Sequence, residues 1–259
     1  TIMENKKHNL KVYKNKFIIG KTDVNNDEYD VLVFAARDIK TFTVPSFIKK
    51  ICSHAFAWSS IENIIITPQV EEIGYEAFVE CQNLSHVEIQ NGSKLASIGK
   101  YAFNSSMIES ILIPQHINEI RKGTFLRCRM LSEIIFAKNS ELKIIGKLAF
   151  ASTSVTNIKL PPSVQEFGES SFSNCQNLVQ IEIPKKSKFH TIGNNAFENS
   201  SIESIILPHN FVEFKEKLCH NTPKLNEVKI TGNKSPYKLE ENGLILTKSD
   251  HNSSVYDVL

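Results

Sequence analysis

The sequence predicts a right-handed α/β solenoid of about nine coils, each of about 22–24 residues, closed at its N-terminal end by a β-hairpin. Two observations support this prediction. The phrase Ile-Gly-x-x-Ala-Phe recurs along the chain with small variations, and a second apolar pattern, Leu-x-x-Ile-x-Ile, follows each copy. A single unit of this length cannot bury its apolar edge alone, so the units must stack to form one continuous core.

The aromatic residue of the first phrase sets the register of the coils. Its spacing alternates between a shorter and a slightly longer interval, and Leu218 takes the next slot after the last aromatic residue. We expect each ring to fill the interior of its coil, with the Ala-Phe segment forming one or two helical turns. The residues in this slot are Phe56, Phe78, Phe103, Phe125, Phe150, Phe172 and Phe197.

The second pattern predicts one β-strand per coil over residues 39–236. Its last apolar positions alternate as a strand with one buried face requires, and β-branched residues are frequent. Proline cannot donate a ladder hydrogen bond, so we expect each proline that follows a strand to end it. These residues are Pro114, Pro161, Pro184 and Pro208, and the glycines that mark the later turn of the coil are Gly74, Gly99, Gly146, Gly168 and Gly193.

The two ends of the chain predict a cap and a second module. Runs 11–19 and 29–35 flank the turn-rich segment 23–27 and predict a β-hairpin within a cap of residues 1–38. Residues 242–259 align without gaps on residues 15–32, with nine identities in eighteen positions. We therefore interpret residues 237–259 as the start of a second hairpin module, a copy of 10–32. Because the chain begins with Thr1, we expect it to be a fragment of a longer protein.

Composition and charge exclude several classes of partner. The formal charge is only +2 and no long basic run is present, so nucleic acid is not the expected partner. No apolar stretch is long enough to span a bilayer, so we expect no membrane contact within these residues. Five cysteines without a CxxC pair predict neither a disulfide framework nor a zinc site, and they leave the redox compartment open.

Chemically reactive residues form no pattern typical of an enzyme. Cys81, Cys128 and Cys175 recur in every second coil, about 10 Å apart in a stacked solenoid, which is beyond the reach of a disulfide. We expect them to be buried thiols that hydrogen-bond the turn, with Ser105, Ser152 and Ser200 in the similar slots of the other coils. Cys52-Ser53-His54 is the alternative nucleophile or ligand, although His54 fits better as a solvated surface residue. The sequence predicts no catalysis, no cofactor and no metal.

The combined phrase Leu-x-x-Ile-x-Ile-Pro-x-x-Val-x-x-Ile-Gly-x-x-Ala-Phe-x-x-Cys resembles the BspA-like, or Treponema-type, leucine-rich repeat over residues 39 to about 230. The chain departs from it at 121–125, where Arg-Lys-Gly-Thr-Phe replaces Gly-x-x-Ala-Phe, and at 217–219. The resemblance implies a surface protein of bacteria or trichomonad-like protists that adheres to matrix, host cells or other microbes. Six sequons could accept glycans outside the cell: Asn83, Asn91, Asn104, Asn199, Asn233 and Asn252.

The predicted binding surface is the column of outward residues on the strands. Its members are Thr43, Ile65, Glu88, Leu112, Ile135, Lys159, Glu182, Ile206 and Lys229. Large apolar residues on a face that points to water favour a partner-binding stripe, although β-branched residues also favour strands for their own sake. We therefore expect a cell-surface or extracellular module that binds protein or glycan. The alternative is an intracellular scaffold built on the same solenoid, because a fold fixes shape and not location.

Overall fold

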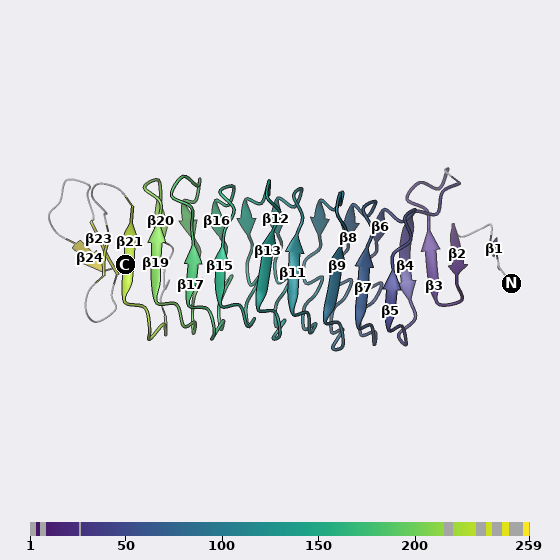
Figure 1. Ribbon diagram of the computed structural model, residues 1–259, viewed down its shortest axis with the longest axis horizontal. Coiled ribbons are helices and arrows are strands. Elements are labelled where there is room, and N and C mark those ends of the chain that lie inside the picture. The colour runs from purple at the N-terminus through teal and green to yellow at the C-terminus, as the bar shows by residue number, and fades with distance from the viewer. Residues whose placement is uncertain are drawn as a thin grey trace.

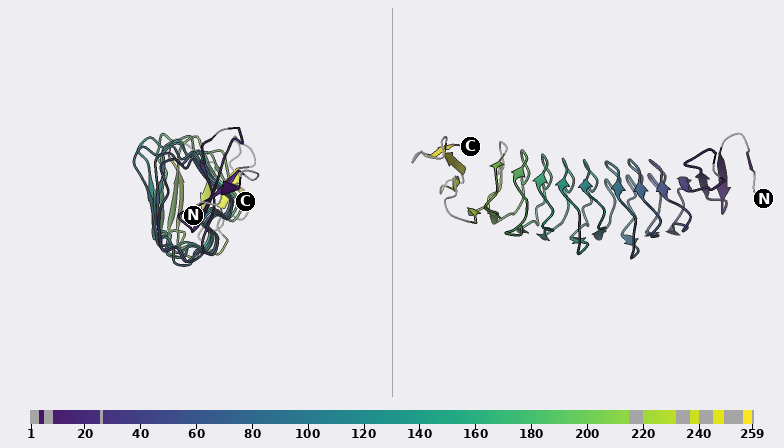
Figure 2. Two further views of the ribbon diagram at one scale, coloured as in Figure 1. Left: turned by 90° about the vertical axis from the view of Figure 1, so that its right-hand side faces the viewer. Right: turned by 90° about the horizontal axis from the view of Figure 1, so that it is seen from above.

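The computed structural model describes residues 4–5, 9–25, 27–214, 220–231, 237–239, 245–248 and 256–258. The protein is an elongated solenoid whose coils follow one another along one axis between the two termini (Figure 1). Viewed down this axis, successive coils superpose on a common outline (Figure 2). The predicted solenoid is therefore confirmed.

One longer strand per coil forms what we call the strand ladder. Its nine members form three hydrogen-bonded parallel groups, β5-β7-β9, β11-β13 and β15-β17-β19-β21, and in the first group Thr43 lies beside Ile65 and Ile65 beside Glu88. They coincide with the Leu-x-x-Ile-x-Ile copies, so the pattern located each strand correctly. The strands are β5 (Thr41–Thr43), β7 (Asn63–Ile66), β9 (His86–Ile89), β11 (Ser110–Ile113), β13 (Glu133–Phe136), β15 (Asn157–Lys159), β17 (Gln180–Glu182), β19 (Ser204–Leu207) and β21 (Glu227–Ile230).

A second set of short parallel strands lies later in each coil, and we call these the rear strands. Each has two residues and ends directly before the glycine slot of the coil. The second residue of each rear strand from β6 to β18 points into the core. The rear strands are β6 (Lys50–Ile51), β8 (Glu72–Ile73), β10 (Ser97–Ile98), β12 (Glu119–Ile120), β14 (Ile144–Ile145), β16 (Glu166–Phe167), β18 (Thr191–Ile192) and β20 (Glu213–Phe214).

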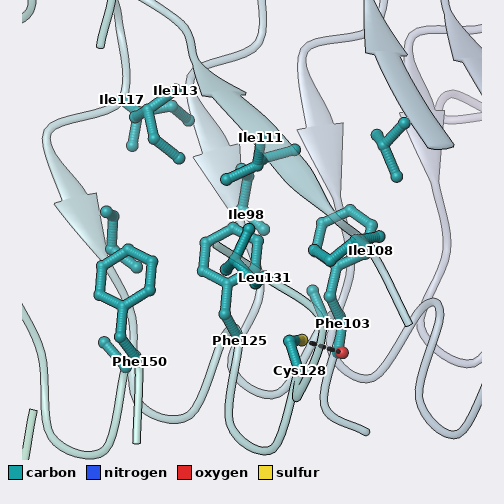
Figure 3. Packing of buried hydrophobic residues seen from close by; sticks show 14 of the residues in the cluster. Ile98, Phe103, Ile108, Ile111, Ile113, Ile117, Phe125, Cys128, Leu131 and Phe150 are labelled. Atoms are coloured by element: carbon teal, nitrogen blue, oxygen red, sulfur yellow. Dashed lines mark hydrogen bonds between the residues drawn. The ribbon is translucent and has the colours of Figure 1, made fainter. Parts of the chain in front are cut away.

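A column of stacked phenylalanine rings fills the interior, as predicted (Figure 3). Phe78 and Phe103 have ring centroids 5.0 Å apart and planes 2° apart, and Phe103 and Phe125 lie 5.6 Å and 5° apart. All seven rings from Phe56 to Phe197 are at most 1% exposed. Because each ring contacts the rings of the coils before and after it, the core is continuous along the axis.

The Ala-Phe segment forms overlapping turns rather than the helical turns that we expected. In the first coil the N–H groups of Ala55 and Ala57 bond to carbonyls three residues earlier, whereas those of Phe56 and Trp58 bond to the next coil. A helix would use every N–H within its own coil. Half of these groups are instead used to join neighbouring coils, so no helix forms among the described residues.

Two positions in each of these turn segments adopt left-handed backbone conformation. In the first coil they are His54, with a φ of 59°, and Trp58, with a φ of 55°. Such positions favour glycine or asparagine, but here Tyr101 and Leu148 also occupy them. The coil-to-coil hydrogen bonds made by the N–H groups of these residues hold the conformation.

The glycine slot allows close approach between coils. A Cβ atom placed on Gly99 would lie 2.5 Å from the backbone of Gly74, and one on Gly168 would lie 2.6 Å from the backbone N of Lys147. The glycine N–H bonds to the preceding rear strand, for example from Gly146 to the carbonyl of Ile120. The prediction that these glycines mark the turn is correct, but their main physical role is this close packing.

One junction lacks this arrangement. Arg121 occupies the glycine slot of its coil, and its N–H makes no bond to the carbonyl of Ile98 within the described backbone. Hydrogen-bonded pairing is also interrupted here in both sheets, between β9 and β11 and between β10 and β12. Arginine at this position, where the five coils from Gly74 to Gly193 that keep the bond have glycine, coincides with the loss of pairing.

The N-terminal cap has more strands than the predicted hairpin. The run 11–19 is itself a tight antiparallel hairpin, β2 (Leu10–Tyr13) and β3 (Phe17–Gly20), and β4 (Val31–Ala35) is the third strand. The turn uses left-handed Lys14 and Asn15, with φ values of 49° and 56°, and no glycine marks it in the sequence. A short strand β1 (Glu4–Asn5) pairs with β2, and β4 pairs parallel with β6, so the cap extends the rear strands.

A second hairpin lies at the C-terminal end, where β22 (Tyr237–Leu239), β23 (Ile245–Lys248) and β24 (Tyr256–Val258) are antiparallel. Tyr237 pairs with Thr247 and Leu239 with Ile245. In the sequence alignment of the two ends, these pairs correspond to Leu10 with Gly20 and Val12 with Ile18, which are paired in the same way. The predicted slot residue Leu218 and its neighbour Cys219 lie outside the described residues.

Candidate functional site

The predicted column of outward residues exists on the strand ladder. Leu112 lies beside Ile135 in the register of β11 and β13, and Ile206 lies beside Lys229 in that of β19 and β21. Lys159 lies beside Glu182, and their side chains form an ion pair of 3.3 Å. Register interruptions separate Glu88 from Leu112, Ile135 from Lys159 and Glu182 from Ile206.

The four apolar members of the column differ in exposure. Ile135 is 46% exposed and Ile206 is 39% exposed, so both project into water. Ile65 and Leu112 are half-buried. The charged members Glu88, Lys159, Glu182 and Lys229 are exposed, as is Thr43. The surface is therefore a mixture of aliphatic and charged side chains rather than a continuous apolar stripe.

A shallow hollow of about 200 Å³ lies where β17 and β19 separate. Only Gln180 and Ser204 are paired between these two strands, whereas four residue pairs join β19 to β21. Ile206 lines the hollow together with Pro184 and Lys185. Glu182 and Ile206 belong to the predicted column, whereas Pro184, Lys185 and Ser204 do not. The basic stretch that begins at Lys185 was the available signal.

A second hollow of about 510 Å³ lies between the cap and the first coils. Its aromatic walls include Tyr13 and the 44% exposed Phe47, whose rings meet edge to face at 5.7 Å. Tyr29 also lines the hollow, with Lys11 Nζ 5.5 Å from its ring centroid. Sequence reasoning missed this hollow because the segments that line it come from the cap and from two coils.

The recurring cysteines are structural, as predicted. The Cys81 and Cys128 thiols donate hydrogen bonds to the carbonyls of Phe56 and Phe103, each at 3.0 Å, and Cys175 does the same to Phe150 at 3.1 Å (Figure 3). Burial raises the pKa of the Cys128 thiol to about 12 and that of Cys175 to about 11. Thiols held in the neutral form are poor nucleophiles.

The hydroxyl residues in the equivalent slots differ in part from the prediction. Ser106 and Thr153 lie 3.4 and 3.3 Å from the next coil's cysteine sulfur, and Ser200 is buried in the same slot. Ser105 and Ser152 instead occupy the left-handed position one residue earlier. The prediction chose the wrong one of two adjacent hydroxyl residues, because the sequence does not show which of the two adopts the left-handed conformation.

The Cys52-Ser53-His54 segment does not assemble a catalytic group. His54 is partly exposed, and its Nε2 lies 3.0 Å from a Glu76 carboxylate oxygen of the next coil. Burial raises the pKa of the Cys52 thiol, which opposes its activation as a nucleophile. Over the described residues, no cluster of three histidine, cysteine or acidic side chains could hold a metal ion. Across the same residues, no helix is long and apolar enough to cross a bilayer.

Comparison with protein families and solved structures identifies the repeat. Residues 30–143 and 137–241 match the family described as BspA type leucine-rich repeat region, which confirms the resemblance noted in the sequence. None of the curated proteins matches the chain.

Several solved structures are similar in fold. A leucine-rich repeat protein from Bacteroides ovatus superposes with a TM-score of 0.58 at 18% identity, covering 85% of this chain and 76% of that one. The pneumococcal vaccine antigen PcpA gives a TM-score of 0.49 at 18% identity, covering 90% and 82%. The leucine-rich repeat protein of T. pallidum gives 0.49 at 17% identity, covering 83% and 90%.

Proposed function

This chain belongs to the BspA-type leucine-rich repeat family, and from that membership we propose that it is a cell-surface module that binds a protein or glycan outside the cell. The strand ladder is the proposed contact surface. Binding there involves no catalysis and no cofactor. The proposed partners are molecules of the extracellular matrix, of a host cell or of another microbe.

The exposure of Ile135 and Ile206 is the observation that carries this proposal. A strand face that only meets water is expected to carry polar residues, yet these two side chains are 46% and 39% exposed. Charged residues flank Ile206, which lies beside Lys229 and near Glu182 at the hollow between β17 and β19, whereas Ile135 lies beside Leu112. Aliphatic contacts with a polar surround are typical of binding surfaces.

The size of the ladder suits a macromolecule. Nine strands with two outward positions each offer 18 residues, close to the roughly 20–30 residues that each partner contributes to a standard interface. The hollow of about 200 Å³ could receive one side chain or sugar ring of the partner.

The alternative function is an intracellular scaffold that uses the same ladder. The two functions differ in the location of the protein and not in its fold. A signal peptide or membrane anchor in the complete gene would support the surface module. Glycans on the sequons of the native protein would support it as well.

The repeated hairpin supports a tandem arrangement of such modules. The pairing register of β22 with β23 is the same as that of β2 with β3 at the aligned positions of the two ends. We propose that residues 237–259 begin a second module with its own cap. A complete gene that encodes no further coils after a second cap would contradict this arrangement.

The binding proposal is tested by replacing Ile135 and Ile206 with serine in the complete chain. Adherence of the labelled protein to cultured epithelial cells and to a cell-free matrix layer should fall at least fivefold, with the melting temperature nearly unchanged. The matched control replaces Val24 and Met130, which are 62% and 48% exposed elsewhere. Equal adherence of the ladder variant and the control would contradict the use of this face.

A further inference from the structure

Unpaired basic side chains gather on the turn segments of two neighbouring coils. The five exposed residues Lys100, Arg121, Lys122, Arg127 and Arg129 form what we call the basic ridge. None of them has an ion-pair partner among the described residues. Some exposed lysines elsewhere do pair with a carboxylate, as Lys16 does with Asp38 and Lys40 with Glu62, each at 2.7 Å.

Like charges are stacked within the ridge. The carbonyls of Lys100, Lys122 and Lys147 accept hydrogen bonds from Glu76, Tyr101 and Gly123 of the preceding coils, so the three lysines hold the same position in successive coils. Lys147 is neutralised by Glu169 at 2.7 Å. Like charges held next to each other repel and therefore oppose folding. Such a cost is typical of residues retained for binding.

Tyrosine rings lie among these cations. The Lys122 Nζ is 5.7 Å from the ring centroid of Tyr101, and the same ring lies against Gly123, where a Cβ would be only 2.3 Å from it. Glycine in this left-handed position therefore makes room for the ring. Tyr75, which is 43% exposed, meets Tyr101 edge to face at 6.3 Å. The ridge thus offers apolar ring surface beside positive charge.

The main chain of the ridge is not available to a ligand. The N–H groups of Tyr101, Phe103 and Ser105 bond to carbonyls of the next coil. An acidic peptide that binds as an added strand needs a free main-chain edge. Recognition on this ridge must therefore use charged side chains and ring surface.

A trough of about 390 Å³ continues the ridge at its far end. Arg127 and Arg129 line it together with Glu80 and Gln82, and Met107 contributes apolar surface. Guanidinium groups bind carboxylate and sulfate through paired hydrogen bonds. The trough therefore adds anion-binding groups to the lysine column.

We propose that the basic ridge binds an acidic polysaccharide. Lys100, Arg121 and Lys122 face its carboxylate or sulfate groups, and Tyr101 contacts the apolar face of a sugar ring. A single-stranded nucleic acid fits less well, because the two tyrosines meet at 89° rather than forming parallel stacking platforms. This site lies on the turn segments, apart from the strand ladder, and does not depend on the function proposed for that face.

The test measures binding of an eight-sugar heparin fragment to the complete chain by calorimetry at low salt. The double substitution Lys100→Gln and Lys122→Gln should weaken binding about tenfold. It should also reduce the slope of log affinity against log salt concentration by the contribution of two charge contacts. The melting temperature should stay the same or rise, since a like-charge contact is removed. Tyr101→Ser should weaken binding without changing the salt dependence.

The matched control carries Lys16→Gln and Lys40→Gln, which remove the same net charge from paired positions outside both proposed surfaces. Its affinity for the heparin fragment should stay within twofold of the unmodified chain. Equal weakening in ridge variant and control would overturn the site, because binding would then follow net charge alone. Binding of an oligoglutamate or an oligothymidylate of equal charge as tight as that of the heparin fragment would overturn the assignment to polysaccharide.

Discussion

The thiol of Cys128 donates a hydrogen bond to the carbonyl oxygen of Phe103 in the preceding coil, at 3.0 Å. The hydroxyl of Ser106 lies 3.4 Å from the same sulfur. The contact therefore joins two coils at the base of the phenylalanine column, in a place without access to water. The protonation of this thiol therefore links the stability of the core to pH.

Cys128 should make the protein less stable in alkali. Burial raises the pKa of this thiol from 9.0 to about 12, so the unfolded chain loses its proton at lower pH than the folded one. The free energy of unfolding should fall as pH rises above 9, by about 1 kcal/mol between pH 9 and 10 from this group alone. Urea unfolding of the unmodified chain and of Cys128→Ser at both pH values checks this. The same pH dependence in both proteins would assign the effect to other groups.

Phe103→Ala should destabilise the fold by about 3–5 kcal/mol, as large aromatic truncations in cores do. The ring is fully buried and stacks on Phe78 and Phe125. Urea unfolding followed by circular dichroism measures the loss. Met130→Ala, at a 48% exposed position, is the control and should change stability by less than about 0.5 kcal/mol. A similar small change for Phe103→Ala would contradict the stacked core.

Gly99→Ala should destabilise more than Gly92→Ala. The new methyl at Gly99 would meet the Gly74 backbone at 2.5 Å, so two coils must move apart, at a cost of about 2–3 kcal/mol. Gly92 has open space around it, and its φ of +76° makes only the backbone conformation unfavourable, at about 1 kcal/mol. Thermal unfolding of both variants gives the order. A reversed order would mean that the coils do not approach closely at the glycine slot.

Asn91 should carry a glycan more fully than Asn199 when the protein is secreted from a eukaryotic cell. Asn91 is exposed and precedes a glycine with open space around it. The Asn199 side chain donates a hydrogen bond to Asn174 at 3.0 Å and accepts one from Asn221. A glycan on Asn199 would break this row of hydrogen-bonded asparagines, which we call the asparagine ladder. Glycopeptide mass spectrometry measures the occupancy of each sequon. Higher occupancy at Asn199 would show that the asparagine ladder does not form in the folded chain.

The strands and the core were predictable because they depend on local apolar periodicity. The slot of Phe103 and the register of Leu112 with Ile135 follow from counting residues in the repeat. The turn segments were not predictable in the same way. His54 and Trp58 are left-handed because of hydrogen bonds to the next coil, and no glycine reports this in the sequence.

The candidate site was predictable in position but not in detail. Ile135 and Ile206 are exposed as expected, whereas Ile65 and Leu112 are half-buried by their neighbours on adjacent strands. The basic ridge was missed because its members come from separate coils. Lys100 and Lys122 are a full repeat apart in sequence, and only the stacking of the coils makes them neighbours.

The junction at Arg121 also determines how the rod responds to mechanical force. Every other glycine slot from Gly74 to Gly193 ties its coil to the one before, whereas Arg121 lacks that bond within the described backbone. A molecule anchored at one end and pulled at the other carries the same tension through every junction. The junction with the fewest hydrogen bonds between coils should therefore open first. Stretching this chain should therefore separate two blocks at Arg121 before either block unravels.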